Sequence, residues 1–175
     1  MADVLEILQE ALQIEKDGEE FYEEAAQCAD NVLAEKTFRG LANAERKHAR
    51  LFQAYYDKMT QAQDWPPVKE MVKQSTSAPQ LAREIFGQVQ EDTEGNCQVT
   101  EDVDELYDRA MEIERRSIDF YQQQHDDAQD DAQRDFFEYL IDQERGHLRI
   151  LSRTQEFLAD PASWYTEDEQ WFATG

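Results

Sequence analysis

The stretch that decides the fold is LANAERKHAR, residues 41–50, because it returns as LIDQERGHLR, residues 140–149. The similarity extends upstream without a gap, so that residues 11–50 align with residues 110–149 at a constant offset of 99. Twelve of the forty aligned positions are identical, and two of the three histidines fall in register. Internal repeats of this length determine an architecture, and we interpret this one as the duplication of a single structural unit.

Each unit is predicted to be a hairpin of two long helices. Apolar residues recur at alternating steps of three and four along both units, which is the period of an amphipathic helix. The turns near 30–31 and 129–130 are short, so the two helices of a unit must be antiparallel neighbours. We therefore expect an all-α fold, a four-helix bundle in one domain spanning 1–175. Its four long helices are expected at about 3–29, 33–59, 101–128 and 131–158.

A long crossover, about residues 60–100, joins hairpin 1 (about 3–59) to hairpin 2 (about 101–158). It is expected to contain a short helix near 78–90. This length lets the second and third long helices run parallel, and we expect those two helices to lie side by side. The acidic, aromatic tail at 159–175 is expected to cover part of the bundle or a partner subunit.

The charge balance excludes several classes of partner. With a formal net charge of −23 over 175 residues, the chain would repel nucleic acids and anionic membrane surfaces. No run approaches the roughly 18 apolar residues of a membrane span, and acidic residues interrupt the first twenty positions, unlike a signal peptide. We expect a soluble, cytoplasmic protein. The two cysteines, Cys28 and Cys97, form no Cys-x-x-Cys pair and predict no thiolate metal site; Cys28 is expected to be a small buried residue.

Six polar residues lie on the stripes that should face the core. Residues at i and i+3 share one helix face, so each Glu-x-x-His pair can direct both side chains at one ion. Four converging carboxylates would repel one another in an apolar interior, and two divalent cations cancel four negative charges. The alternative, surface residues at chance spacing, leaves their register with the apolar stripe unexplained. The predicted metal ligands are Glu15, Glu45, His48, Glu114, Glu144 and His147.

The segments Glu15-x6-Tyr22, Glu45-Arg-Lys-His48, Glu114-x6-Tyr121 and Glu144-Arg-Gly-His147 resemble rubrerythrin-like proteins of the ferritin-like superfamily. The resemblance covers 1–60 and 101–158. It implies a ferritin-like bundle and a di-iron centre bridged by Glu45 and Glu144. It also implies that Tyr22 and Tyr121 hydrogen-bond ligand carboxylates and orient the bridges, although ordinary aromatic core packing is an alternative. Carboxylate-rich ligation without thiolate suits iron or manganese.

Two departures from that family limit what the resemblance implies. Rubrerythrin carries a rubredoxin domain that is lacking in this sequence, so the electron donor is expected to be a separate protein. An extra glutamate ligand of the third helix has no counterpart, because Met111 and Ser117 occupy the positions one turn from Glu114. Glu19, one turn after Glu15, is either an added ligand or a solvated or hydrogen-bonded acid. His125 lies about 16 Å along its helix from Glu114, at 1.5 Å per residue, and is too distant to be a ligand.

The sequence is compatible with three functions. The resemblance implies an oxidoreductase that reduces hydrogen peroxide or dioxygen with electrons from the external donor. A ferroxidase or iron-handling protein would use the same centre, and a non-catalytic, metal-stabilised bundle would use it only for folding. The resemblance also implies a homodimer. The sequence leaves the substrate, the donor and the choice among iron, manganese or mixed occupancy undetermined.

Overall fold

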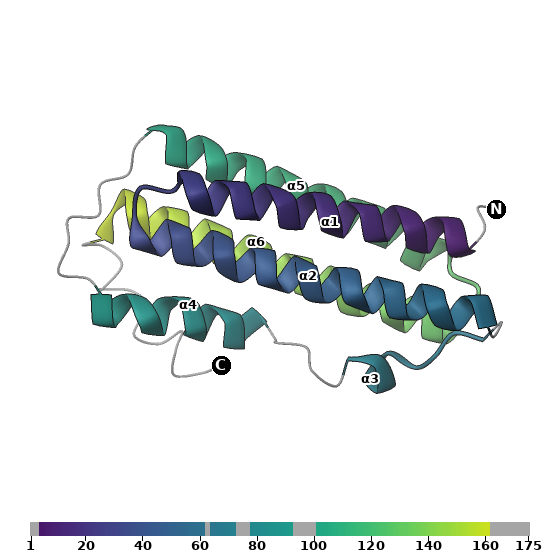
Figure 1. Cartoon of the computed structure of the whole chain (residues 1–175). Coiled ribbons are helices and arrows are strands. Elements are labelled where there is room, and N and C mark those ends of the chain that lie inside the picture. The colour runs from purple at the N-terminus through teal and green to yellow at the C-terminus, as the bar shows by residue number, and fades with distance from the viewer. Residues whose placement is uncertain (1–3, 62–63, 73–77, 93–100, 162–175) are drawn as a thin grey trace.

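The computed structural model describes residues 4–61, 64–72, 78–92 and 101–161 (Figure 1). Four long helices dominate this part of the chain, and their ends lie within about three residues of the expected positions. Two shorter helices belong to the crossover, and one of them, α3, was not expected from the sequence. The six helices are α1 (Val4–Cys28), α2 (Val32–Gln61), α3 (Val68–Met71), α4 (Ala78–Asp92), α5 (Glu101–Asp127) and α6 (Asp131–Ala159).

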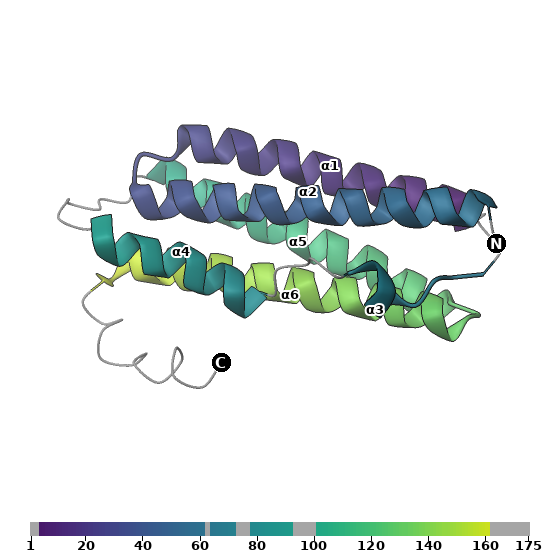
Figure 2. The same cartoon turned by 60° about the horizontal axis from the view of Figure 1, so that its bottom comes forward.

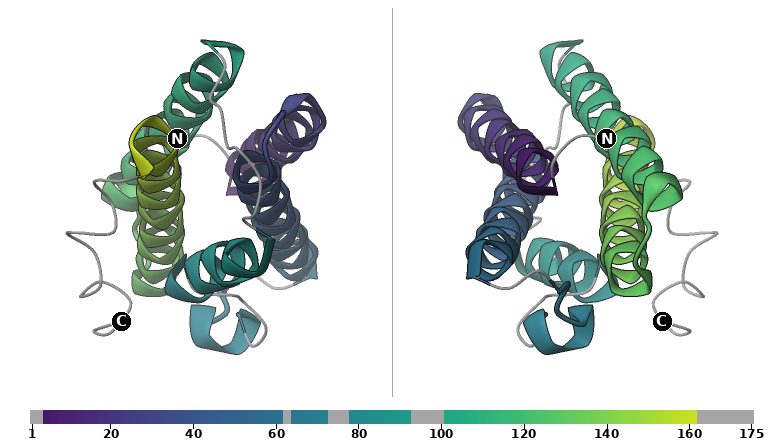
Figure 3. Two further views of the ribbon diagram at one scale, coloured as in Figure 1. Left: turned by 90° about the vertical axis from the view of Figure 1, so that its left-hand side faces the viewer. Right: turned by 90° about the vertical axis from the view of Figure 1, so that its right-hand side faces the viewer.

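The long helices form the two predicted hairpins, α1 with α2 and α5 with α6 (Figure 1). Viewed end-on, α1 lies beside α5 and α2 lies beside α6, which places α2 and α5 on a diagonal (Figure 3). The expectation that α2 and α5 run parallel is confirmed, but the expectation that they are neighbours is wrong. Each helix instead packs against its own repeat counterpart, which brings the equivalent core stripes of the two halves face to face.

The second helix of each hairpin begins at a side-chain cap, and the two caps are repeat counterparts. The Asn31 side chain accepts a hydrogen bond from the backbone N–H of Ala34 at 2.7 Å. Asp130 accepts from the N–H groups of Ala132 and Gln133 at 2.8 and 3.1 Å. Such caps satisfy N–H groups that have no partner within the helix. They set where α2 and α6 begin, and therefore which residues of these helices face inward.

The crossover helix α4 packs against both α2 and α6 and covers one side of the bundle (Figure 2). Two glycines permit this close approach. A Cβ on Gly40 of α2 would lie 3.1 Å from the Ile85 side chain, and a Cβ on Gly146 of α6 would lie 2.2 Å from the Cβ of Ala78. Because Ala78 has no flexible side chain that could move aside, the residue at position 146 must lack a Cβ for α4 to start here.

The apolar core falls into two clusters at opposite ends of the bundle. One contains Tyr22 of α1 and Leu41 of α2, and the other contains Leu8 of α1 and Phe52 of α2. Trp65, at the start of the crossover, packs on the second cluster, where its ring centroid lies 5.5 Å from that of Tyr55. A band of buried polar residues separates the two clusters, and this band contains the candidate site.

Two further expectations have separate outcomes. Cys28 is exposed, so its expected burial is wrong; it occupies the last position of α1, where the helix gives way to the turn. Most of the aromatic tail and Cys97 lie outside the described residues. Among the described helices, none is long and apolar enough to cross a membrane.

Candidate metal centre

All four long helices contribute to one buried cluster of carboxylates and imidazoles. Helices α1 and α5 each supply one glutamate, and α2 and α6 each supply a Glu-x-x-His pair. None of the six residues is more than 5% exposed. The structure therefore brings together all six side chains that the sequence singled out. They are Glu15, Glu45, His48, Glu114, Glu144 and His147.

The six residues form two overlapping groups, each of which could hold one metal ion. The first consists of Glu15, Glu45, His48 and Glu144, and the second of Glu45, Glu114, Glu144 and His147. Within a group, the potential ligand atoms all lie within 4.8 Å of one another. Glu45 and Glu144 belong to both groups, which is the arrangement required of two bridging carboxylates.

The distances within the two groups reflect the symmetry of the repeat. His48 Nδ1 lies 3.1 Å from Glu144 Oε1, and His147 Nδ1 lies 3.0 Å from Glu45 Oε1. The same nitrogens lie 3.3 Å from Glu15 Oε2 and 3.5 Å from Glu114 Oε2, respectively. The two imidazole rings are stacked with centroids 5.4 Å apart. One nitrogen and several carboxylate oxygens thus converge at each of two adjacent points.

Most of the converging atoms lie close to one another but make no hydrogen bond of acceptable geometry. The buried atoms without such a hydrogen bond are both oxygens of Glu144, one oxygen each of Glu15 and Glu45, and Nδ1 of both histidines. Buried polar atoms are almost always hydrogen-bonded, because leaving one unpaired costs about 1–3 kcal/mol. Six such atoms on five neighbouring side chains, aimed inward, are the donor set that metal coordination would satisfy. This set of oxygen and imidazole ligands fits the iron or manganese expected from the sequence.

When no cation is bound, protonation of the carboxyl and imidazole groups can balance the negative charge of the cluster. Burial raises the pKa of the Glu15 and Glu114 carboxyls well above the ordinary value, so both favour the neutral form. Burial alone would lower the pKa of His48 and His147, but the charges of Glu144 and the other carboxylates outweigh it and raise both pKa values well above 6.5.

The pKa values of the two shared glutamates move in the opposite direction. Burial acts to raise the pKa of Glu45, yet the neutral Glu15 carboxyl and the charged His147 beside it lower that pKa well below 4.5. Burial and the nearby Glu45 act to raise the pKa of Glu144, and the charges of His147 and His48 outweigh them. Two carboxylates then face two imidazolium ions, which balances the charge. Two divalent cations facing four carboxylates and two neutral imidazoles would balance it equally well.

Tyr22 and Tyr121 each donate a hydrogen bond from one hairpin to the other. Tyr22 Oη donates to Glu114 Oε1, and Tyr121 Oη donates to Glu15 Oε1. Burial raises the pKa of both phenols well above 10, which keeps them protonated as donors. Both tyrosines contact ligand candidates, as the resemblance implied. Their partners, however, are the two unshared glutamates, so the prediction that they orient the bridging pair is wrong.

We expect Tyr22→Phe to weaken metal binding by the group that contains His147. Tyr121→Phe should weaken metal binding by the group that contains His48. Each change removes the hydrogen bond that fixes one oxygen of an unshared glutamate, and such outer contacts are typically worth a factor of about 10–100 in metal affinity. Each variant serves as the matched control for the other. A cobalt titration followed by visible absorbance measures the two affinities separately, and equal loss at both positions in either variant would contradict the assignment.

Glu19 is not part of the cluster. It accepts a hydrogen bond from Arg46 Nε at 2.7 Å, and Arg46 also pairs with Glu23. This geometry matches the alternative of a hydrogen-bonded acid. The sequence did not single out Arg46, which ties α1 to α2 beside the ligand pair; its identity with Arg145 in the repeat was the available signal. His125 contacts Asp126 at 2.9 Å, away from the centre, as expected.

Comparison with known proteins identifies the family. The family model described as Rubrerythrin matches residues 6–155, which contain all six clustered residues and the crossover. No curated protein and no solved structure matches this chain. A match over this share of the 175 residues establishes the relationship: the chain belongs to the rubrerythrin family.

Proposed function

We propose that this protein binds two iron ions in the cluster and reduces hydrogen peroxide with electrons from a separate donor protein. The observation that carries the proposal is the overlap of the two four-residue groups through Glu45 and Glu144. Two ferrous ions bound there would supply the two electrons that, with two protons, convert one hydrogen peroxide into two waters. Dioxygen is the alternative oxidant.

The residues of the cluster have defined roles in this proposal. His48 and His147 would hold the ions through nitrogen, and Glu15 and Glu114 would each hold one ion while Tyr121 and Tyr22 fix their carboxylates. Glu45 and Glu144, which belong to both groups, would be shared by the two ions. The two apolar clusters on either side exclude bulk water and keep these six side chains in place, so the ligand geometry would be set before metal enters.

A separate donor is part of the proposal because the family resemblance implied one; residues 1–175 contain no Cys-x-x-Cys pair. A homodimer, implied by the family resemblance, is part of the same proposal. Sedimentation of the metal-loaded protein measures its oligomeric state.

Stopped-flow absorbance of the ferrous-loaded protein tests the function. Mixing with hydrogen peroxide should oxidise both ions faster than mixing with dioxygen, with the iron retained after gel filtration. Faster oxidation by dioxygen, followed by release of ferric iron, would instead establish a ferroxidase; the acidic surface expected from the net charge of −23 would suit that role by attracting cations. No reaction with either oxidant would leave only a structural role for the metals. The Glu19→Gln variant, which changes an acid outside the cluster, is the control.

A further inference from the structure

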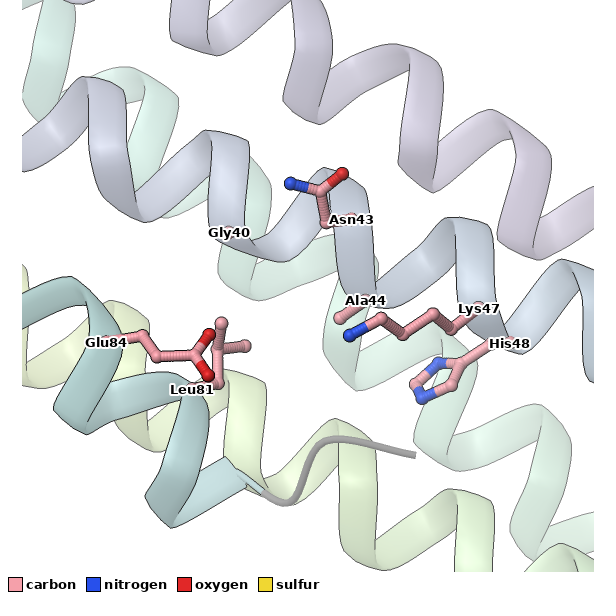
Figure 4. A pocket seen from close by; sticks show the side chains of 7 residues that line it. All are labelled: Gly40, Asn43, Ala44, Lys47, His48, Leu81 and Glu84. Carbon is pink, nitrogen blue, oxygen red and sulfur yellow. The ribbon is translucent and has the colours of Figure 1, made fainter. Parts of the chain in front are cut away.

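Two pockets on the side of the bundle covered by the crossover reach the same ligand candidate, His48. The first has a volume of about 210 Å³ and lies between α2 and α4, with Ala44, Leu81 and Glu84 in its wall (Figure 4). The second has a volume of about 270 Å³ and is lined by α2, α6 and the end of α3, with Ala54 and Tyr139 in its wall. Lys47 and His48 line both pockets, whereas His147 lines neither.

The repeat explains why these hollows lie against His48. The residue before His48 is Lys47, and its counterpart before His147 is Gly146. At Gly146 the start of α4 lies so close that an added Cβ would meet the Cβ of Ala78 at 2.2 Å. The start of α4 and helix α6 are therefore in close contact at Gly146, the residue before His147. On α2 the counterpart position carries the long side chain of Lys47, and α4 contacts α2 about two turns earlier, at Gly40.

The walls of the first pocket suit a small polar oxidant. Lys47 and Glu84 place polar groups along its sides, and Figure 4 shows Lys47 beside His48 on α2 with Glu84 across the pocket on α4. Hydrogen peroxide both donates and accepts hydrogen bonds, and a volume of about 210 Å³ exceeds what one such molecule needs. Otherwise the close-packed apolar clusters on both sides of the centre offer no comparable polar path among the described residues.

We propose that hydrogen peroxide enters the centre through these two pockets, so that the ion held by Glu15, Glu45, His48 and Glu144 meets the oxidant first. This inference rests on the proposed function, since it concerns the route to the same centre. The halves of the repeat thereby differ in role, because His48 lines both pockets and His147 lines neither.

A bulky side chain placed in each pocket, called a plug below, tests the route without a measurement of turnover. The variants are Ala44→Trp, Ala54→Trp and the double variant. The matched control is Gln143→Trp, which places the same side chain at the repeat counterpart of Ala44, outside both pockets. In cobalt-loaded protein, azide serves as the small probe, and stopped-flow absorbance measures its association rate. The visible bands before mixing report whether the ligand set is intact.

We expect azide association in the double variant to be at least roughly tenfold slower than in the Gln143→Trp control, because both pockets would be filled and entry would require the helices that line them to move apart. Either single variant that slows association identifies the pocket in use. If the double variant binds azide as fast as the control with its cobalt bands unchanged, the route is wrong. Should a plug prevent cobalt binding, the smaller Ala44→Met and Ala54→Met changes replace it, with Gln143→Met as the control, and the same comparison decides.

Oxidation of the ferrous proteins by hydrogen peroxide separates this inference from the proposed function. A wild-type protein that peroxide oxidises no faster than dioxygen would refute peroxide reduction, while the azide measurement would still report on the route. A wild-type protein that reacts with peroxide, together with a double variant that reacts as fast as the control, would refute the route alone.

Discussion

Replacement of Glu144 by alanine is expected to abolish binding of both metal ions, whereas replacement of Glu15 should remove only one. Glu144 belongs to both ligand groups, and neither of its oxygens has a hydrogen-bond partner. Glu15 belongs to one group and already shares one oxygen with Tyr121. Loss of a buried charged partner costs about 3–5 kcal/mol. Removal of the shared carboxylate should therefore weaken the binding free energy of each ion by an amount of that order.

The measurement is metal content per chain after gel filtration, combined with a cobalt titration. We expect two ions in the wild type, about one in Glu15→Ala and none in Glu144→Ala. Glu114→Ala should match Glu15→Ala by symmetry, with loss of the ion on the His147 side. Glu19→Ala is the control, because that acid pairs with Arg46 and should leave two ions bound. Two ions retained in Glu144→Ala would show that the carboxylate is not a bridge.

The sequence was sufficient to predict the cluster because the same periodicity places apolar and ligand residues on one stripe. Glu15 lies seven residues before Tyr22, and Glu45 lies three residues before His48, so each set occupies one face of a straight helix. Repetition at a fixed offset then fixed the corresponding residues of the second half. Local spacing decides such features, and no tertiary information was needed for them.

The features that the sequence did not reveal depend on how the helices meet. The diagonal placement of α2 and α5 arises because each helix packs on its counterpart, which periodicity within one helix does not encode. The partners of Tyr22 and Tyr121 follow from that placement, since α1 and α5 are neighbours and exchange hydrogen bonds across their interface. The position of α4 depends on Gly146, and a glycine inside a helix has no single interpretation until the packed neighbour is known.

The difference between Lys47 and Gly146 gives the near-symmetric centre two unequal sides. The ligands repeat at one offset, yet the crossover lies on only one side of the bundle and exists in one copy (Figure 2). The single helix α4 therefore packs against two helices, α2 and α6, that are repeat counterparts. The sequences of these helices differ where α4 approaches, with Lys47 in α2 and Gly146 in α6. The two pockets beside the centre are lined by His48 and not by His147.

Binding of two divalent ions is expected to release close to four protons at about pH 5.5. This pH is about one unit above the ordinary pKa of a glutamate and one unit below that of a histidine. Glu15 and Glu114, with raised pKa values, hold two carboxyl protons in the metal-free cluster, and His48 and His147 hold two imidazolium protons. Metal ligands must be deprotonated, so the ions displace these protons. Calorimetric titration with cobalt in buffers of different ionisation enthalpy measures the number released.

The same protons make the metal-free and metal-loaded proteins respond to pH in opposite directions. Groups whose pKa is raised by folding stabilise the fold below the unfolded value, and that stability is lost as the pH rises through the folded value. The metal-free protein should therefore become less stable from about pH 4.5 upward for the two glutamates and from about pH 6.5 upward for the two histidines. Glu45 and Glu144 have lowered pKa values, so they make the fold more stable as the pH rises. This opposite effect is confined to more acidic solution, where these two carboxylates become protonated.

Metal affinity should rise over the range in which the metal-free fold weakens. Each displaced proton contributes about 1.4 kcal/mol per pH unit, so four protons strengthen the binding of the ion pair by about 5.5 kcal/mol per unit near pH 5.5. Urea unfolding at several pH values, with and without cobalt, measures both trends. Release of fewer than two protons, or a metal-free fold that gains stability from pH 6.5 to 8.5, would contradict the charge balance. The ions would then not replace protons in the cluster, and its carboxylates would have to be neutralised by another group.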